Sequence, residues 1–381
     1  MTLLDAESSA SYGSGHLLFA RDGTLMAQPF DPGALRPTGD PFPLAEHVSR
    51  EASRYVGASV SENGTLVYGR DDSLTPTQLT WLDRSGHVLG TLGEPARYTS
   101  LALSPDESRV AVALGTGSPE NVDIWIIDTA RNVPSRVTDD AGFDGPPVWS
   151  PDGTRIAFGH SRSGKGSLRQ KLINETAEES LFEVSGTPSR PCDASRGITC
   201  TVWPNGWSAD GRFIAYTLRG SFPLTSDVWV LPLSGDRNPF SLAQTAFLEA
   251  AGVFSPDGKW IAYTTNEAGQ PDVYVQPFLR PGGKYPVSKD GGTLPAWRAD
   301  GKELFYVTSG GTLMSVPIDA TDHFKAGVPQ ALFAFRLGAP TFNQVYAVTK
   351  DGKRFLVNAR PQQSSAAPLT VVLNWTAAIQ K

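Results

Sequence analysis

The chain repeats one arrangement of apolar and polar residues along most of its length. A short apolar segment leads into a polar tetrad such as Ser-Pro-Asp-Gly, and a second apolar segment follows directly, as in VFSPDGKWIAY at 253–263. The tetrads begin at residues 61, 104, 150, 208, 255, 298 and 349. A period of about 45 residues is the one expected for propeller blades of four strands each.

Each repeat holds enough apolar segments for four short strands. The strand after the tetrad is followed by another, as in DIWIID from Asp123, DVWVLP from Asp227 and DVYVQP from Asp272. A polar turn and a weaker apolar segment then lead to the next tetrad. No repeat shows a convincing stretch of helical periodicity, so the pattern predicts an all-β protein of four-stranded antiparallel sheets and argues against a parallel sheet with crossover helices.

A degenerate first copy brings the count to eight repeats. HLLFARDGTLMAQPFD from His16 parallels ELFYVTSGGTLMSVPID from Glu303, and the last copy has only three strands. The N-terminal MTLLDA has the character of the missing outer strand, so we expect both chain ends to share one blade and close the ring. The prediction is therefore a single β-propeller domain over 1–381, with eight blades, or seven if the first copy belongs to a neighbour. The repeats lie near 8–48, 55–95, 98–140, 144–186, 200–245, 248–290, 293–337, and 342–381 together with 1–6.

The tetrads have the composition of hairpin turns. Proline presets φ at the second turn position, Ser and Asp side chains bond to nearby backbone, and glycine adopts the positive φ that closes the hairpin. The large residue before the tetrad is expected to fill the wedge between adjacent blades. We assign these residues a structural role, because carboxylates dispersed around a ring do not form one catalytic site. They are Pro151, Asp152, Gly153, Asp210, Gly211, Pro256, Asp257, Gly258, Asp300, Gly301, Asp351 and Gly352.

Other candidate motifs are incomplete. GHSRSGKG at 159–166 approaches the phosphate-binding loop, but glycine stands where a hydroxyl must bind magnesium, and no helix follows. The chain has no G-x-S-x-G elbow, no protein-kinase signature and no histidine pair at metal-ligand spacing. Asp123, Asp227 and Asp272 could face one side of the ring together, although turn capping at strand starts is the preferred interpretation. We therefore predict no catalytic residue, no cofactor and no metal site.

Charge and hydropathy narrow the class of partner. The formal net charge is -6 and no Lys/Arg-rich block occurs, which argues against a nucleic-acid surface. No apolar run reaches the roughly 18 residues that span a bilayer, and the first residues lack the pattern of a signal peptide. We expect a soluble monomer with no transmembrane segment and no export signal in this chain.

The two cysteines lie in RPCDASRGITC, at Cys192 and Cys200. Their spacing is not that of a zinc site or a redox motif. A local disulfide in an oxidising compartment and two unpaired thiols both remain open. The long step between the tetrads at 150 and 208 contains them, so we expect an insertion on one face of the ring.

The repeat SPDGKWIAY followed by DVYVQPF resembles the WD40-like propeller repeat of the TolB type, which prolyl oligopeptidase-family proteases share. LLFARDGTLMAQPFD, LTWLDRSG, DVWVLPLSGDRNPF, WRADGKELFYV and VVLNWTAAI resemble, over essentially the whole chain, the C-terminal propeller of bacterial membrane-anchored serine/threonine protein kinases. In that family a cytoplasmic kinase domain and a transmembrane helix precede an extracytoplasmic propeller. The resemblance implies a periplasmic or cell-surface location, but not kinase activity, because the kinase residues are absent.

Two functional hypotheses of different class follow. The first is a non-catalytic binding or sensory module for a protein, peptide or small-molecule ligand. The second is a propeller enzyme, such as a lactonase or glycan lyase, whose site would converge on the central channel. Titratable groups with strongly perturbed pKa values at a channel mouth would favour the enzyme, and a shallow face of aromatic and arginine residues would favour partner binding.

Overall fold

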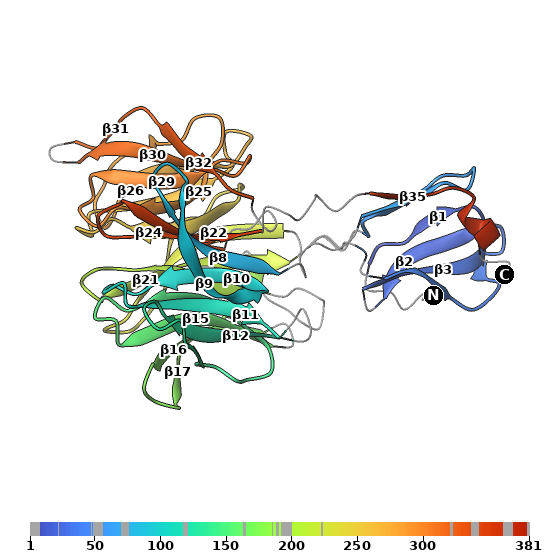
Figure 1. The fold of residues 1–381 in the computed structure, drawn as a ribbon, viewed down its shortest axis with the longest axis horizontal. Coiled ribbons are helices and arrows are strands. Elements are labelled where there is room, and N and C mark those ends of the chain that lie inside the picture. Colours follow the sequence, from blue (N-terminus) through green and yellow to red (C-terminus); the bar gives the residue numbers. More distant parts are fainter. Residues whose placement is uncertain are drawn as a thin grey trace. The chain divides into compact units, whose positions relative to one another are not determined.

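The chain divides into two compact units in this computed structural model. The small unit comprises Met1–Thr75 with Gln362–Lys381, and the large unit is Pro76–Pro361 (Figure 1). The repeats predicted a single domain over 1–381, whereas the structure divides the chain into these two compact units. The structure describes residues 8–21, 23–46, 48, 56–69, 76–116, 121–162, 165–184, 186–187, 190–191, 200–221, 224–320, 323–336, 343–360 and 369–378.

The large unit contains six antiparallel blades, named A to F. Blade B is β10 (Tyr98–Leu103), β11 (Arg109–Gly115), β12 (Val122–Asp128) and β13 (Pro134–Arg136). Blade C is β14 (Phe143–Trp149), β15 (Arg155–Arg162), β16 (Lys165–Leu172) and β17 (Glu178–Glu183). Blade D is β20 (Cys200–Trp207), β21 (Phe213–Ser221), β22 (Leu224–Pro232) and β23 (Phe240–Ala243). A two-stranded sheet of β18 (Gly186–Thr187) and β19 (Arg190–Pro191) lies between blades C and D in the sequence.

Blades E, F and A complete the ring. Blade E is β24 (Glu249–Phe254), β25 (Trp260–Thr265), β26 (Asp272–Pro277) and β27 (Tyr285–Pro286). Blade F is β28 (Thr293–Trp297), β29 (Glu303–Val307) and β30 (Thr312–Asp319), whose outer edge pairs with β31 (Lys325–Ala326) and β32 (Gln330–Ala334). Blade A is β33 (Tyr346–Val348), β34 (Arg354–Ala359), β8 (Thr77–Asp83) and β9 (Val88–Ala96).

Burial explains the apolar composition of the strands. All six residues of β25 are buried, since neighbouring blades cover both faces of this second strand. Each innermost strand contacts the innermost strand of the next blade, in the order β10, β14, β20, β24, β28, β33, and β33 contacts β10 again. The six blades therefore form a closed ring.

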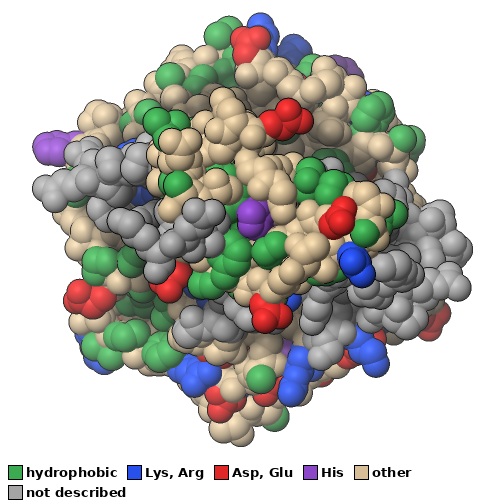
Figure 2. All heavy atoms as spheres, turned by 90° about the vertical axis from the view of Figure 1, so that its right-hand side faces the viewer, with side chains coloured by type: hydrophobic (Ala, Val, Ile, Leu, Met, Phe, Trp, Pro, Cys, Tyr) green, Lys and Arg blue, Asp and Glu red, His purple; other side chains and the backbone are tan. Residues whose placement is uncertain are grey.

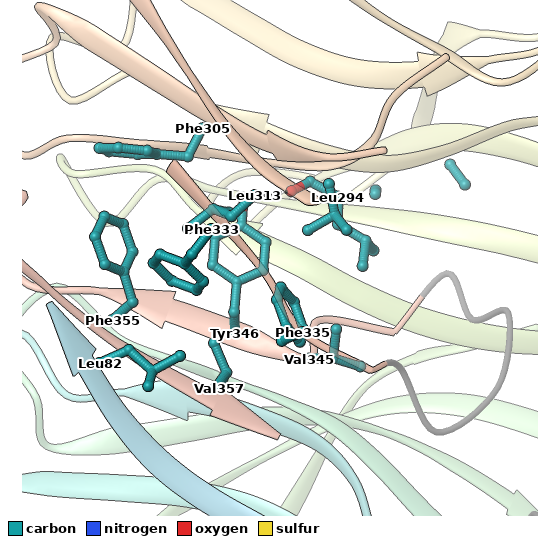
Figure 3. Close-up of a cluster of buried hydrophobic side chains, with 13 residues drawn as sticks. Leu82, Leu294, Phe305, Leu313, Phe333, Phe335, Val345, Tyr346, Phe355 and Val357 are labelled. Atoms are coloured by element: carbon teal, nitrogen blue, oxygen red, sulfur yellow. Dashed lines mark hydrogen bonds between the residues drawn. The ribbon is translucent and has the colours of Figure 1, made fainter. Parts of the chain in front are cut away.

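Blade A closes the ring by joining the two ends of the large unit. β34 pairs antiparallel with β8, from Arg354 opposite Asp83 to Ala359 opposite Gln78. Phe355 and Tyr346 of blade A pack against Phe305 and Leu294 of blade F in one buried cluster (Figure 3). This packing makes blade A an integral part of the ring.

The predicted four-stranded antiparallel sheets are confirmed, but the ring has six blades rather than eight or seven. The predicted closure also differs, because the third and fourth strands beside β34 come from the second repeat and not from residues 1–6. Residues 1–6 lie outside the described residues. β8 and β9 take the third and fourth positions beside β34, while β35, the third strand of the last repeat, pairs with β7 instead, so the ring closes without the first repeat.

The small unit is built from two sheets. One contains β1 (Ser11–Gly13), β2 (His16–Arg21), β3 (Thr24–Asp31), β4 (Arg36–Pro37) and β5 (Phe42–Ala45). The other has β6 (Ala58–Val60), β7 (Leu66–Tyr68) and the C-terminal β35 (Thr370–Val372), followed by the 3-10 turn η3 (Trp375–Ala378). Leu18, Leu25, Leu66 and Trp375 are buried in their shared core.

Candidate functional site: the central channel

A cavity of about 490 Å³ opens where the six innermost strands end, and we call it the channel mouth. Every blade contributes the last residue of its innermost strand to the wall. These residues are Leu103, Trp149, Trp207, Phe254, Trp297 and Val348. The repeat pattern thus places one large apolar residue per blade around a common axis.

Prolines form much of the remaining wall. Pro105, Pro151 and Pro256 come from the polar tetrads, and four further prolines come from the innermost strands, namely Pro146, Pro147, Pro204 and Pro295. The tetrad residues Pro151 and Pro256, predicted as turn residues, therefore also line the rim of the cavity. This dual position was not foreseen, because a linear repeat does not show which end of the strand faces the axis.

Charged groups are missing from the lining. Among the described residues, the wall includes no Asp, Glu, Lys, Arg, His or Cys, and its polar side chains besides Tyr346 are Asn205, Ser255 and Gln344. The hydroxyl of Tyr346 is buried and donates a hydrogen bond to the Leu294 carbonyl at 2.7 Å. Burial raises the pKa of Tyr346, so this group stays protonated at neutral pH.

Five tetrads of the ring repeat the same hydrogen bond from a Ser or Thr hydroxyl to the turn aspartate, whereas in blade F Arg298 donates to Asp300 instead. In the tetrad of blade C, the Ser150 hydroxyl donates to Asp152 Oδ1 at 2.5 Å, and this carboxylate oxygen also accepts from the Thr154 amide at 3.0 Å. The hydroxyl in turn accepts from the Arg155 amide at 2.9 Å. Gly153, Gly211, Gly258, Gly301 and Gly352 all have positive φ, between 67° and 75°. These contacts are those of a tight turn.

The turn carboxylates accept hydrogen bonds from nearby donors of their own turns. The hydrogen bonds from the Ser150 hydroxyl and the Thr154 amide lower the pKa of Asp152 to about 2. The pKa values of Asp210, Asp257, Asp300 and Asp351 are also lowered. A carboxylate held in its charged form by a turn is a poor proton carrier, and these lie in separate blades.

Two of the three tryptophans that precede tetrads link adjacent blades, whereas Trp207 Nε1 donates to the Gly211 carbonyl of its own turn at 3.3 Å. Trp149 Nε1 donates to the Ala102 carbonyl at 3.0 Å, from blade C to blade B. Trp297 Nε1 donates to the Val253 carbonyl at 3.3 Å, from blade F to blade E. The indoles of Trp149 and Trp297 thus bridge innermost strands while one face borders the cavity, which fixes the shape of the wall.

The strand-opening aspartates do not meet in the channel. Asp123 accepts from Arg136 at 2.9 Å, and Asp272 accepts from the Ser288 hydroxyl at 2.7 Å and the Gly291 amide at 3.1 Å. Asp227 is buried within β22. Asp123 and Asp272 therefore bind groups of their own blades, as expected for capping of strand ends.

One buried hydrogen-bonded pair was not predicted from the sequence. Asp144 Oδ1 and His160 Nδ1 lie 2.7 Å apart, with side chains only 1% and 7% exposed. The two residues face each other across β14 and β15. They line no part of the channel mouth, and no linear motif marks a pair that only strand register brings together. In the described ranges, no group of three or more His, Cys, Asp or Glu could hold a metal ion.

The remaining predictions concern the insertion and the surface. Cys200 is buried at the start of β20, while Cys192 lies outside the described residues, so the disulfide stays a prediction. Figure 2 shows acidic and basic side chains scattered singly over the face in view. No helix in the described part of the chain is long and apolar enough to cross a membrane.

Comparisons with known proteins identify the fold. The chain is 28% identical over 165 residues to the Tol-Pal system protein TolB of Alcanivorax borkumensis, covering 42% of this chain and 37% of that protein. It is 28% identical over 141 residues to a TolB homolog of Chlorobium luteolum, covering 37% of this chain and 28% of that protein. The chain thus matches only about a third of each relative. No protein-family profile matches it.

A solved structure supports the same assignment. The structure of a putative TolB from Agrobacterium tumefaciens superposes with a TM-score of 0.56 at 16% identity, covering 75% of this chain and 99% of that one. At this identity the likeness concerns the fold alone. The chain contains a TolB-like β-propeller and is distantly homologous to TolB proteins.

Proposed function

We propose that this protein is a non-catalytic binding module and that the channel mouth binds an extended, uncharged segment of polypeptide. The observation that carries the proposal is the wall itself, which has tryptophan, phenylalanine or proline from each of blades B to F, Tyr346 from blade A, and no charged side chain among the described residues. Binding pockets are typically mostly apolar, with a few polar groups that fix orientation. A volume of about 490 Å³ falls within their usual range of about 300–1,000 Å³.

The polar groups of the wall suit a peptide backbone. The Asn205 amide oxygen accepts from the Thr217 hydroxyl at 2.6 Å, which fixes the orientation of the amide group. The Gln344 side chain donates to the Tyr346 carbonyl at 2.8 Å. Grooves lined by aromatic side chains bind extended, proline-rich segments, whose backbone is already ordered before binding. An uncharged wall also disfavours charged ligands, because burying an unpaired charge is costly.

Catalysis has less support than binding. A propeller enzyme would need an acid, a base or a metal at the channel, and among the described lining residues only Tyr346 ionises. The buried Asp144 and His160 are bonded to each other away from the cavity. We therefore favour recognition over a lactonase or lyase activity.

The biological setting follows from resemblance. We propose an extracytoplasmic location and a role as the ligand-binding region of a sensor, by similarity to the propellers of bacterial membrane serine/threonine kinases. The support is the order of motifs along the chain, together with the distant homology to TolB proteins.

Selection from a random-peptide phage library tests the binding proposal. The full chain serves as bait, and selected peptides are titrated by calorimetry. We expect enrichment of uncharged sequences rich in proline and aromatic residues. Ala347→Asp and Ala296→Asp each place a carboxylate in the wall and should weaken binding by at least about tenfold, since desolvating that charge costs more than about 1.4 kcal/mol.

Val328→Asp is the matched control, because Val328 is 75% exposed and lies outside the cavity. It should bind like the parent protein. Enrichment of acidic or basic peptides, or equal weakening by the wall and control variants, would overturn the proposal.

A further inference from the structure

Apart from the single parallel residue pair between β12 and β14 and the outer pairings of β3 with β5 and of β30 with β32, the strand order breaks the sequence order at two places among the described strands. In blades B to E, and for the first three strands of blade F, neighbours in the sheet are also neighbours in the chain. The two exceptions are the pairing of β34 with β8 and the pairing of β7 with β35. Both exceptions involve the second and third strands of a repeat.

These two exceptions are complementary. The second repeat contributes β6 and β7 to the small unit but β8 and β9 to the large unit. The last repeat contributes β33 and β34 to the large unit but β35 to the small unit. If β7 paired with β8 and β34 paired with β35, these two repeats would have the same sequential strand order as the other blades.

The chain between these strands is long enough for either pairing. In blades B to F the second and third strands are joined by two to six residues. Eight residues join β7 to β8, and ten join β34 to β35. Each of the two repeats can therefore form a hairpin between its own second and third strands. Closing a loop of eight or ten residues costs little more free energy than closing a loop of two to six.

β35 shows a burial deficit in its present pairing. Val371 of this strand and the residues that flank it, Leu369 and Leu373, lie at alternate positions and are 57%, 69% and 72% exposed, respectively. The equivalent third strand in blade A buries Leu79 and Leu82. Alternating apolar side chains on a strand are expected to face a packed neighbour. In the small unit these three side chains lack that cover among the described residues.

We propose that the chain exchanges between two strand pairings. One is the present arrangement, with a six-bladed ring and a separate small unit. The other is an eight-bladed ring in which every repeat forms its own blade and the aliphatic row of Leu369, Val371 and Leu373 is buried between blades. The two states use the same strands and differ in which partners β7 and β34 select.

The exchange would control the channel. In the six-bladed state the channel mouth is bounded by six innermost strands, and two more would widen it and separate its tryptophans and prolines. A ligand that fits the narrow channel would stabilise the six-bladed state by its differential affinity. This consequence rests on the proposed function, whereas the exchange itself does not.

Distances between spin labels at Ser85 and Lys353 distinguish the states. Both residues are exposed, and both adjoin the paired positions Asp83 and Arg354 of β8 and β34. In the present pairing the labelled backbones are about one strand spacing apart, roughly 5 Å. In an eight-bladed ring one blade separates them, which places them about 20 Å apart. The labels are introduced as Ser85→Cys and Lys353→Cys in the full chain, with Cys192 and Cys200 replaced by serine.

Dipolar EPR without any ligand should show both distances. Leu369→Ser with Leu373→Ser should reduce the long-distance population by about tenfold or more, because these leucines gain burial only in the eight-bladed state. Leu279→Ser with Val328→Ser, at positions 62% and 75% exposed outside β35, should leave it unchanged. A single short distance in all variants overturns the exchange, as does an equal response to both double substitutions. Neither result depends on whether peptides bind the channel.

Discussion

Phe355→Ala tests whether blade A closes the ring of the large unit. Phe355 lies in β34 and is completely buried. Its ring meets Phe305 of blade F at 5.2 Å between centroids and Phe333 at 5.5 Å, both edge to face (Figure 3). The substitution therefore removes contacts to the neighbouring blade from the strand that pairs the two ends of the large unit.

The expected loss of unfolding free energy is about 3–5 kcal/mol, the range for deleting a buried phenylalanine side chain from a packed core. Edge-to-face aromatic pairs are worth about 0.5–1.5 kcal/mol beyond their buried area, so the upper half of the range is expected. Urea unfolding followed by tryptophan fluorescence measures the loss. Eight of the nine tryptophans lie in the large unit, so the signal reports mainly on the ring.

Val88→Ala provides the control within the same blade. Val88 is 55% exposed on β9, and its truncation should change stability by less than about 0.5 kcal/mol. A loss below about 1 kcal/mol for Phe355→Ala would refute the packing of β34 on blade F. A loss of unfolding free energy no larger than that of Val88→Ala would also refute this packing.

Three further predictions concern single groups. Glu303→Gln should destabilise the large unit by about 1–3 kcal/mol in the same urea assay, since its carboxylate accepts from Arg84 at 2.7 Å and Arg298 at 2.9 Å; an unchanged midpoint would contradict this. The Asp152 carboxylate should titrate by NMR near pH 2, so that its contribution to stability is complete above the unfolded pKa of about 3.9 and disappears as pH falls through about 2; a midpoint at 3.9 would exclude the Ser150 and Thr154 hydrogen bonds. Mass spectrometry after alkylation in denaturant without reductant should find no adduct on Cys192 or Cys200, because the predicted disulfide blocks both sulfur atoms, and two adducts would contradict that disulfide.

Local structure was predictable from the repeat because it depends on nearby residues. The tetrads encode their turns through Pro, Asp and Gly at fixed offsets, and the apolar residue before each tetrad lies next to the turn in the chain. The strand content of each blade follows from short apolar segments between such turns. These features need no knowledge of distant partners.

The number of blades was not predictable, because it depends on pairing between distant strands. The sequence offers β34 either β35 or β8 as a partner, since both are short segments with apolar residues that follow a second strand of a repeat, although β8 has seven residues and β35 three. A sequence pattern describes both candidates equally well, and the difference lies in packing such as that around Phe355. The uncharged channel wall depends on the same nonlocal arrangement, as does the Asp144 and His160 pair.

Hydrogen exchange in the presence of a selected peptide tests the central claim, that the channel mouth of a six-bladed ring is the binding site. The account predicts new protection in the innermost strands β10, β14, β20, β24, β28 and β33, and in the tetrads with Pro105, Pro151 and Pro256 that follow three of them. Ala347→Asp should abolish this protection. Protection confined to outer strands such as β17 and β23, or to the small unit, would contradict it.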